Sequence, residues 1–142
     1  MARALLDATV VIAFADTDDQ DHELGTEIVR GVDAGDLPDG VVTNGALLEL
    51  LNFVHDRNGQ AMATDLLDRL IEGAHFHLPY DPKENYGVGR SLFRRYEGLS
   101  FGDALQVAYM QGEDLDYIYS FDCDFDAVDG ITRLATADNP FV

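Results

Sequence analysis

The sequence predicts an α/β domain whose central sheet is largely parallel. Short apolar runs typical of strands alternate along the 142-residue chain with segments of helical periodicity. Strands that are separated by helices pair in parallel, because each helix returns the chain to the same end of the sheet. No linker, internal repeat or low-complexity tract divides the chain. We therefore expect one domain over residues 1–142, which is long enough to bury its own core.

The expected elements follow from turn and capping signals. The segments expected to form strands are 2–6, 41–42, 76–78, 117–120 and 131–134. The segments expected to form helices are 9–14, 22–34, 44 to about 57, 60–72, one that starts at 81–82, and 101–111. Residues 36–40 form a turn before the second strand. Thr43 or Asn44 caps the third helix and Gly59 ends it, while Pro82 suits the first turn of the fifth helix and Ser100 caps the sixth.

The charge balance is strongly acidic. Twenty-seven acidic residues face nine basic ones, giving a net charge of −18, and Lys83 is the only lysine. Such a surface repels nucleic acid, suits a basic partner, or reflects adaptation to a cytoplasm of molar salt, and the scarcity of lysine favours the last. At about 1 M salt the Debye length is only about 3 Å. The acidity therefore does not exclude an RNA substrate, although it removes the usual compositional evidence for one.

The sequence also predicts where the protein works. Its apolar stretches are too short and interrupted to span a bilayer, and the N-terminus lacks the pattern of a signal peptide. Cys123 is the only cysteine, so no intramolecular disulfide can form. We expect a cytoplasmic protein without a membrane segment.

Four carboxylates stand in otherwise apolar segments: Asp7, Glu49, Asp103 and Asp122. A carboxylate in such a position is costly unless something compensates its charge. All four lie at predicted strand ends or on helices that follow strands, and ligands of parallel sheets bind beyond the carboxyl ends of the strands. The pattern predicts that they converge on a divalent cation, as in sites for phosphoryl chemistry.

Three of the four acids also have an ordinary structural explanation. Asp7 suits the N-cap of a helix, Glu49 suits an exposed helix position, and Asp103 suits the first turn, where the helix dipole favours an acid. The run SFDCDFD contains Asp122 but does not begin an EF-hand loop. Counted from Asp122, the sixth and twelfth positions are alanine and arginine, where an EF-hand loop needs glycine and glutamate.

Four further residues are candidates for supporting roles. Thr9 can hydrogen-bond to the first aspartate or to a substrate phosphate. Asn52 can orient the glutamate three residues before it. Ser120 can contact a metal-bound water, and Asp126 is the alternative to Asp122 as the fourth acid.

Other polar residues give weaker signals. His75 and His77 alternate on one face of a predicted strand, but no third zinc ligand lies near them in the sequence. Arg90, Arg94 and Arg95 are spaced for one helix side. We expect surface ion pairs with neighbouring acids there, with contacts to substrate phosphates or to an acidic partner segment as the alternatives.

The ordered set of acidic motifs resembles the PIN-domain nucleases, and within them the VapC-like toxins. The matching pieces are LLDATVVIAF at 5–14, LLELLN at 47–52, LSFGDALQVA at 99–108 and YSFDCDFD at 119–126. The resemblance implies a three-layer α/β/α fold and cleavage of RNA that depends on Mg²⁺ or Mn²⁺. It places the family acids at Asp7, Glu49, Asp103 and Asp122, of which the last is the least uniform family position. It also implies a homodimer and an antitoxin partner that inserts into the site.

On this interpretation Asp7 and Asp103 are the main metal ligands. Glu49 and Asp122 hold metal-bound waters or a second ion, with one of them as the base. Two alternatives stay open, a catalytically silent PIN-like binding or scaffold module and a housekeeping RNA-processing nuclease. A phosphoacceptor receiver domain fits poorly, because Lys83 lies at a predicted helix start rather than at a late strand end.

Overall fold

The computed structural model describes residues 2–142 and shows a five-stranded, all-parallel sheet in the order β3-β2-β1-β4-β5. The strands are β1 (Arg3–Leu6), β2 (Asp39–Val41), β3 (Phe76–His77), β4 (Tyr117–Tyr119) and β5 (Thr132–Leu134). The helices are α1 (Ala8–Ala15), α2 (His22–Asp33), α3 (Asn44–Asn58), α4 (Gln60–Glu72), α5 (Glu84–Arg95) and α6 (Phe101–Gly112), with a 3₁₀ turn η1 at Cys123–Ala127. The predicted α/β class with a parallel sheet is confirmed.

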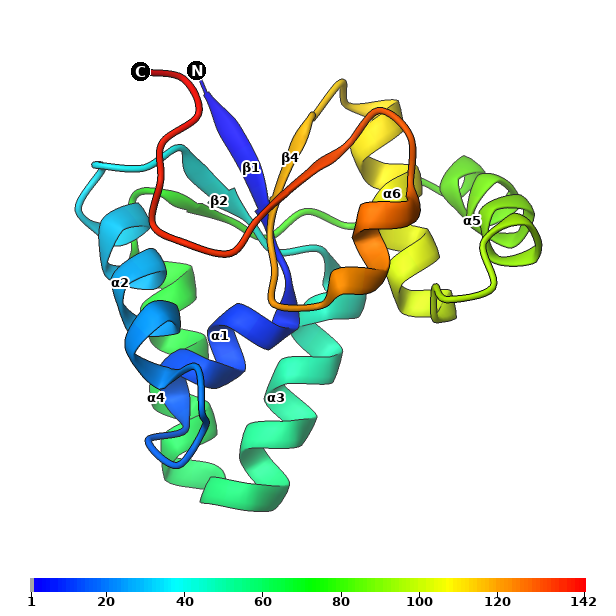
Figure 1. Ribbon diagram of the computed structural model, residues 1–142. Helices are drawn as coiled ribbons and strands as arrows, with labels where there is room; N and C mark the ends of the chain where they lie inside the picture. The colour runs from blue at the N-terminus through cyan, green and yellow to red at the C-terminus, as the bar shows by residue number, and fades with distance from the viewer. Residues whose placement is uncertain (1) are drawn as a thin grey trace.

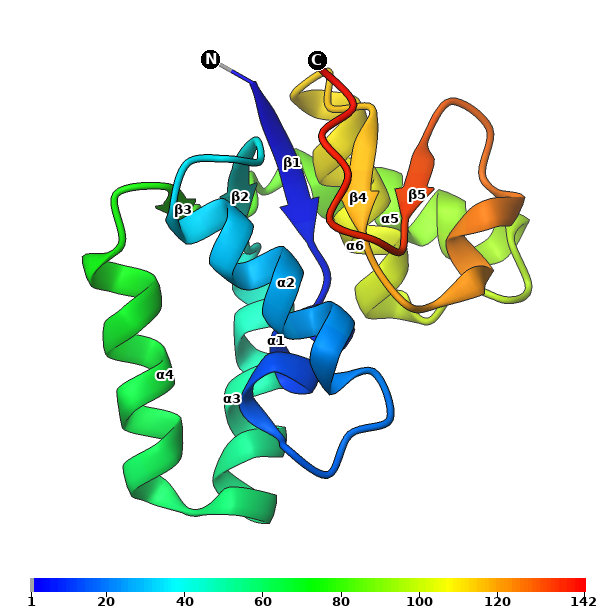
Figure 2. The same cartoon turned by 60° about the vertical axis from the view of Figure 1, so that its left-hand side comes forward.

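The sheet separates two apolar cores. Helices α1 to α4 lie on one side of it, and α5, α6 and η1 lie on the other, which gives the three layers α/β/α (Figures 1 and 2). Strand β1 is central because its alternating side chains enter both cores: Ala4 and Leu6 pack in the first and Leu5 in the second. Leu5 pairs with Val41 of β2 and Ile118 of β4 in parallel register. Both faces of this strand are therefore dry, which explains its unbroken apolar sequence.

Strand β2 begins inside the segment that the sequence predicted as a turn. It starts at Asp39, whose backbone N–H donates to the carbonyl of Ala2 at 3.0 Å. The Asp39 carboxylate is buried and accepts hydrogen bonds from His75 Nδ1 at 3.0 Å and His77 Nε2 at 2.8 Å. Burial raises the pKa of Asp39, but the bonds from the two histidines outweigh it and the pKa is lowered. The two histidines are distant from Asp39 in the sequence. They allow an aspartate inside a strand at a position where the local sequence predicts a turn.

Helix α5 begins at Glu84 and not at the predicted 81–82. The backbone N–H of Asp81 donates to the side chain of Asn44 at 2.9 Å, which ties this loop to the start of α3. Residues 81 and 82 therefore belong to the connection, although proline suits a helix start. In the described part of the chain, no helix is both long and apolar enough to cross a bilayer.

Candidate active site

The centre of the site is Asp7, which directly follows β1 and is buried. Its Oδ1 accepts a hydrogen bond from Gln106 Nε2 at 2.9 Å. Its Oδ2 accepts from Ser120 Oγ and from Thr9 Oγ1, each at 2.7 Å. Asp7 stands at the N-cap position of α1 but makes no capping hydrogen bond with its side chain. The carboxylate is thus held by three neutral donors and is not used to start the helix.

Thr9 and Ser120 join the ends of β1 and β4 around this carboxylate. The backbone N–H of Phe121 donates to Thr9 Oγ1 at 3.2 Å, and that of Asp122 donates to Ser120 Oγ at 3.0 Å. Each hydroxyl therefore accepts one bond from the chain after β4 while it donates to Asp7. This exchange fixes the positions of Asp7 and Asp122 relative to each other at the carboxyl edge of the sheet.

Asp103 lies in the first turn of α6, inside a capping box with Ser100. The Asp103 backbone N–H donates to Ser100 Oγ at 3.1 Å, and the Ser100 N–H donates to Asp103 Oδ2 at 3.4 Å. Burial, followed by the charge of Asp7, raises the pKa of Asp103 to about 7, with a smaller contribution from Asp122. The hydrogen bonds from Ser100 oppose this shift without cancelling it. The helix start thus positions the carboxylate, and its burial together with its acidic neighbours raises its pKa.

Glu49 reaches the same region from α3. Burial raises the pKa of Glu49, and the charges of Asp7 and Asp122 raise it further. Glu49 and Asp103 therefore both respond to Asp7 and to Asp122, although the four acids come from different elements. The fold brings the four predicted carboxylates to one region.

No ion pair among the described residues neutralises this negative charge, although Arg133, which is paired with Asp126, lies close enough to Asp122 for the charge of Asp122 to raise its pKa. Within residues 2–142, none of the four acids forms an ion pair with an arginine, lysine or histidine. Over the same residues, no three His, Cys, Asp or Glu side chains are already close enough together to hold a metal ion. The carboxylates repel one another through space without forming a closed cage. Hard oxygen donors with unbalanced charge fit Mg²⁺ or Mn²⁺, which would draw them together.

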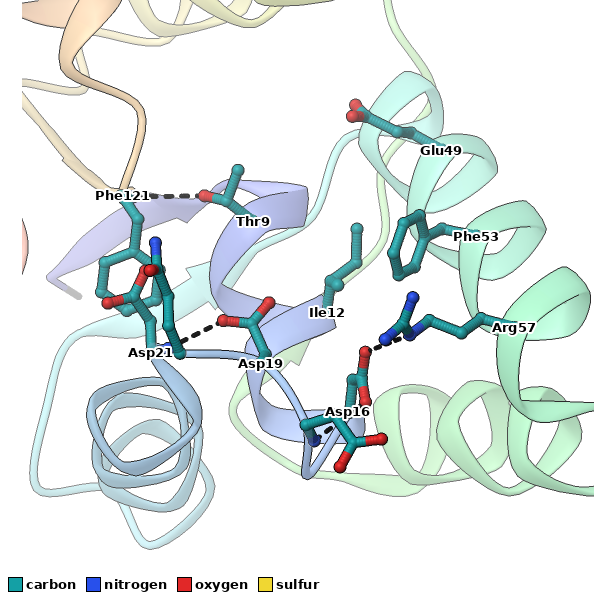
Figure 3. A pocket seen from close by; sticks show the side chains of 11 residues that line it. Thr9, Ile12, Asp16, Asp19, Asp21, Glu49, Phe53, Arg57 and Phe121 are labelled. Carbon is teal, nitrogen blue, oxygen red and sulfur yellow. Dashed lines mark hydrogen bonds and ion pairs between the residues drawn. The ribbon is translucent and has the colours of Figure 1, made fainter.

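A pocket of about 520 Å³ opens beside these acids. Thr9 and Glu49 form part of its wall, and Glu49 points from α3 toward the side where Thr9 lies (Figure 3). Five carboxylates line it: Asp16, Asp18, Asp19, Asp21 and Glu49. Arg57 contacts the buried Asp16 at 2.7 Å and is thereby already neutralised. The pocket therefore offers negative charge to a ligand.

The other predicted supporting residues differ in position. Asn52 lies in a separate depression with His55 and Gln60, and does not line the pocket of Glu49. Asp126 is exposed, and both of its oxygens accept hydrogen bonds from Arg133, at 2.9 and 3.0 Å. These bonds lower the pKa of Asp126.

Asp122 occupies the better position for the fourth acid. Its charge raises the pKa of both Glu49 and Asp103, whereas Asp126 contributes to neither shift. Asp122 also accepts the backbone N–H of Asp124 at 2.9 Å and so begins η1, a turn that the sequence did not predict. These interactions thus favour Asp122 over Asp126 as the fourth acid.

Sequence reasoning missed Gln106. This residue is buried on α6, one turn after Asp103, and its amide donates to Asp7. Its own Oε1 is buried and has no partner among the described residues. The available signal was a glutamine inside the apolar run ALQVAYM, where a buried polar side chain needs a partner.

Comparison with known families identifies the class of protein. A model of the PIN domain family matches residues 4–131, so the chain belongs to the PIN domain family. A comparison with curated proteins finds no match.

Solved structures then show which members the fold is similar to. One is VapC20 of Mycobacterium tuberculosis, a sarcin-ricin loop cleaving toxin, with a TM-score of 0.77, 18% identity, and coverage of 90% of this chain and 96% of that chain. Another is a toxin–antitoxin complex from Klebsiella pneumoniae, with a TM-score of 0.65, 16% identity, and coverage of 96% and 98%. A third is VapBC2 of Rickettsia felis bound to a promoter DNA fragment, with a TM-score of 0.67, 12% identity, and coverage of 93% and 97%. The predicted VapC-like PIN fold is confirmed.

Proposed function

We propose that this protein is a Mg²⁺- or Mn²⁺-dependent endoribonuclease, and that it is the toxin of a type II toxin–antitoxin pair in the cytoplasm. The observation that supports this most is the environment of the buried Asp7. All of its side-chain hydrogen-bond donors are neutral. Its charge and that of Asp122 act on Glu49 and Asp103 at the same edge of the sheet. A PIN domain that keeps such a cluster without a compensating cation is built to hold a metal ion.

The residues divide the work by position. Asp7 at the end of β1 and Asp103 at the start of α6 would hold a divalent ion, and Asp122, in the chain after β4, would hold a metal-bound water or a second ion. A bound divalent ion supplies a water of lowered pKa and neutralises charge on the scissile phosphate. Glu49 borders the open pocket, and its raised pKa suits it to accept a proton from the attacking water at a carboxylate oxygen. Thr9 and Ser120 fix the orientation of Asp7 throughout.

The first test replaces Asp7 by asparagine, which keeps its shape and removes its charge. We expect Asp7→Asn to abolish Mg²⁺-dependent cleavage of RNA, with a far-UV circular dichroism spectrum and thermal unfolding like those of the wild type. A labelled RNA is incubated with each protein, with and without EDTA, and the products are separated on a gel. Full activity in the variant would refute the proposal.

A paired comparison tests the fourth acid. Asp122→Asn should lower the cleavage rate strongly, whereas Asp126→Asn should leave it near the wild-type rate because Arg133 already binds that carboxylate. The two changes are chemically identical and only four residues apart. The reverse result would transfer the role to Asp126.

Two observations favour a toxin over a housekeeping RNA-processing nuclease. The fold is similar to those of toxins from toxin–antitoxin pairs, and five carboxylates line the pocket beside the site, where a basic antitoxin segment would fit. We expect induced expression to arrest growth in a way that Asp7→Asn prevents, and co-expression with a small DNA-binding protein encoded next to the gene to relieve the arrest. Normal growth on expression of active enzyme would favour the housekeeping role.

A catalytically silent binding or scaffold module is the remaining alternative. Isothermal titration with Mg²⁺ and Mn²⁺ separates the two cases. A scaffold would bind neither ion. A nuclease would bind the metal as the wild type and lose this binding in Asp7→Asn. The same preparations, run on a sizing column with light scattering, test the proposed homodimer.

A further inference from the structure

Three exposed aromatic rings gather where α5 packs against the start of α6. The Phe101 ring lies 5.7 Å from that of Phe93, in an edge-to-face arrangement, and 6.4 Å from that of Tyr86, measured between centroids. Each of the three residues keeps between 38% and 47% of its surface exposed. Tyr86 and Phe93 are seven positions apart on α5 and so project from one side of the helix. The rings therefore form one continuous apolar patch, which a solvated surface does not require.

The same helix carries uncompensated positive charge. Helix α5 contains Arg90, Arg94 and Arg95 but only one acid, Glu84, in a chain whose net charge is −18. In the part of the chain that the structure describes, none of these arginines pairs with a carboxylate. The surface ion pairs that we expected from the sequence are therefore not formed.

Helix electrostatics explains only some of these cations. Arg94 and Arg95 stand in the last turn, where the helix dipole favours positive charge. Arg90 is in the middle of the helix, four residues after Tyr86 and three before Phe93, and so lies on the same side as both rings. A free guanidinium beside a cluster of exposed rings is a combination that folding alone does not explain.

This surface adjoins the carboxylates. Phe101 lies two residues before Asp103 in the first turn of α6, so the ring and the carboxylate project from opposite sides of the same helix start. Helix α5 lies outside α6, and α6 begins at the end of the sheet where β1 meets α1 (Figure 1). An RNA whose scissile phosphate lay at a metal ion held by Asp103 would need to pass only around the start of α6 to reach the rings.

We propose that the surface formed by Tyr86, Phe93, Phe101 and Arg90 binds unpaired nucleotides of the RNA substrate next to the cleaved bond, an inference that rests on the proposed function. Bases stack on the exposed rings, and Arg90 contacts a backbone phosphate. Coulombic attraction cannot hold RNA on a chain of this net charge, so a contact with the bases is needed to supply affinity. An apolar protein partner fits less well, because it would bury the guanidinium of Arg90 without a counter-charge.

Direct binding measurements test this surface. The inactive Asp7→Asn protein is titrated into a short, labelled, single-stranded oligoribonucleotide, and the fluorescence anisotropy gives Kd. Adding Tyr86→Ala and Phe93→Ala should raise Kd roughly tenfold or more, while binding of a duplex RNA of the same length should not change. Phe101 is left intact because it belongs to the turn that holds Asp103.

A matched control and a salt series refine the test. Phe141→Ala removes a ring of similar exposure, 51%, near the C-terminus at the opposite end of the strands (Figure 1), and should leave Kd unchanged. Arg90→Gln should reduce the slope of log Kd against log salt concentration by about 0.7, the value for one lost phosphate contact on single-stranded RNA. Phe93→Ala should change Kd without changing that slope.

Cleavage kinetics separate this inference from the proposed function. In the active chain, the two ring substitutions should raise KM and leave kcat near the wild-type value, with unchanged thermal unfolding. If the wild type cleaves RNA but the ring variants bind and cleave it equally well, this surface is not an RNA site and the ribonuclease assignment stands. If those variants instead become monomeric on a sizing column with unaltered RNA affinity, the rings join two copies of the chain and the inference is overturned. A wild type that neither binds nor cleaves RNA overturns both proposals.

Discussion

At the scale of single residues, the least expected contact is the hydrogen bond from Gln106 to Asp7. It is the only one of the three donors to Asp7 that binds Oδ1, so it fixes the rotation of the carboxylate together with the two hydroxyl groups that bind Oδ2. Gln106→Leu fills the same space and removes this bond. We expect a loss of roughly 10- to 100-fold in activity or in apparent Mg²⁺ affinity, the usual effect of removing a group that orients a metal ligand.

The measurement for Gln106 is the cleavage rate as a function of Mg²⁺ concentration. Gln111→Leu is the control, since Gln111 is exposed on the same helix, and it should behave like the wild type. Equal rates for Gln106→Leu and the wild type at every Mg²⁺ concentration would show that the two hydroxyl donors suffice.

The raised pKa of Asp103, about 7, gives a prediction for stability against pH. In the unfolded chain this group titrates near 3.8, so between pH 4 and 7 the folded state binds more protons than the unfolded state. Without metal, the free energy of unfolding therefore falls as the pH rises through this window. Asp103→Asn removes this loss of stability. The free energy of unfolding of the variant relative to that of the wild type should therefore grow from pH 4 to 7 and then stay constant. The total growth should be at most about 1.4 kcal/mol per unit of pKa shift.

Urea unfolding in EDTA at several pH values measures this advantage. Asp68→Asn, at an exposed position on α4, should show a difference that does not vary with pH. Mg²⁺ at pH 8 should stabilise the wild type more than Asp103→Asn. A flat difference for Asp103→Asn would mean that neither burial nor the acidic neighbours destabilise its carboxylate.

These residues also show how much of the site the sequence contains. The four acids stand out because each interrupts an apolar run, and Thr9 is only two residues from Asp7. Gln106 also interrupts an apolar run, but the run does not reveal its partner, because its bond to Asp7 spans 99 positions and depends on how α6 packs beside β1. Local patterns reveal a carboxylate that needs a partner, but the choice of partner is made by the tertiary fold.

At the scale of elements, the sharpest constraint is the joint between α3 and α4. Gly59 links the two helices with φ +92° and ψ 169°, a conformation that residues with a Cβ rarely adopt. Nothing lies within 4 Å of the position that a Cβ would take, so any cost of substitution is purely conformational. We expect Gly59→Ala to lower the free energy of unfolding by about 1–3 kcal/mol, as measured by denaturant unfolding.

A second glycine supplies the comparison for Gly59. Gly87 lies within α5 and also has no atom within 4 Å of a built Cβ, but its backbone is helical. Gly87→Ala should raise stability by up to about 1 kcal/mol. If both substitutions changed the free energy of unfolding in the same direction, the positive φ of Gly59 would not be what restricts the residue at this position.

Element boundaries were predictable where the signal is local. Residues 60–72 match α4 at both ends, because glycines flank that helix on each side. Strand β2 and the start of α5 were misplaced because Asp39 depends on one histidine just before β3 and one within it, and Asp81 depends on the start of α3. A strand or helix that is positioned by distant side chains gives no local signal at its end.

At the scale of the whole molecule, the net charge of −18 determines how stability depends on salt. Repulsion among 27 acidic side chains opposes the compact state, and mobile ions screen it. We expect the midpoint of thermal unfolding to rise steeply from low salt to about 2 M KCl at pH 7.5. This behaviour is what adaptation to a saline cytoplasm would require.

The same salt series near the isoelectric point isolates the cause. At a pH close to 4.1, the sequence pI, the net repulsion is gone while the effect of salt on apolar surface remains. The rise with KCl should therefore be much smaller there than at pH 7.5. Equal salt dependence at the two pH values would assign the stabilisation to apolar burial and not to the acidic surface, and the case for a halophilic origin would lose its physical basis.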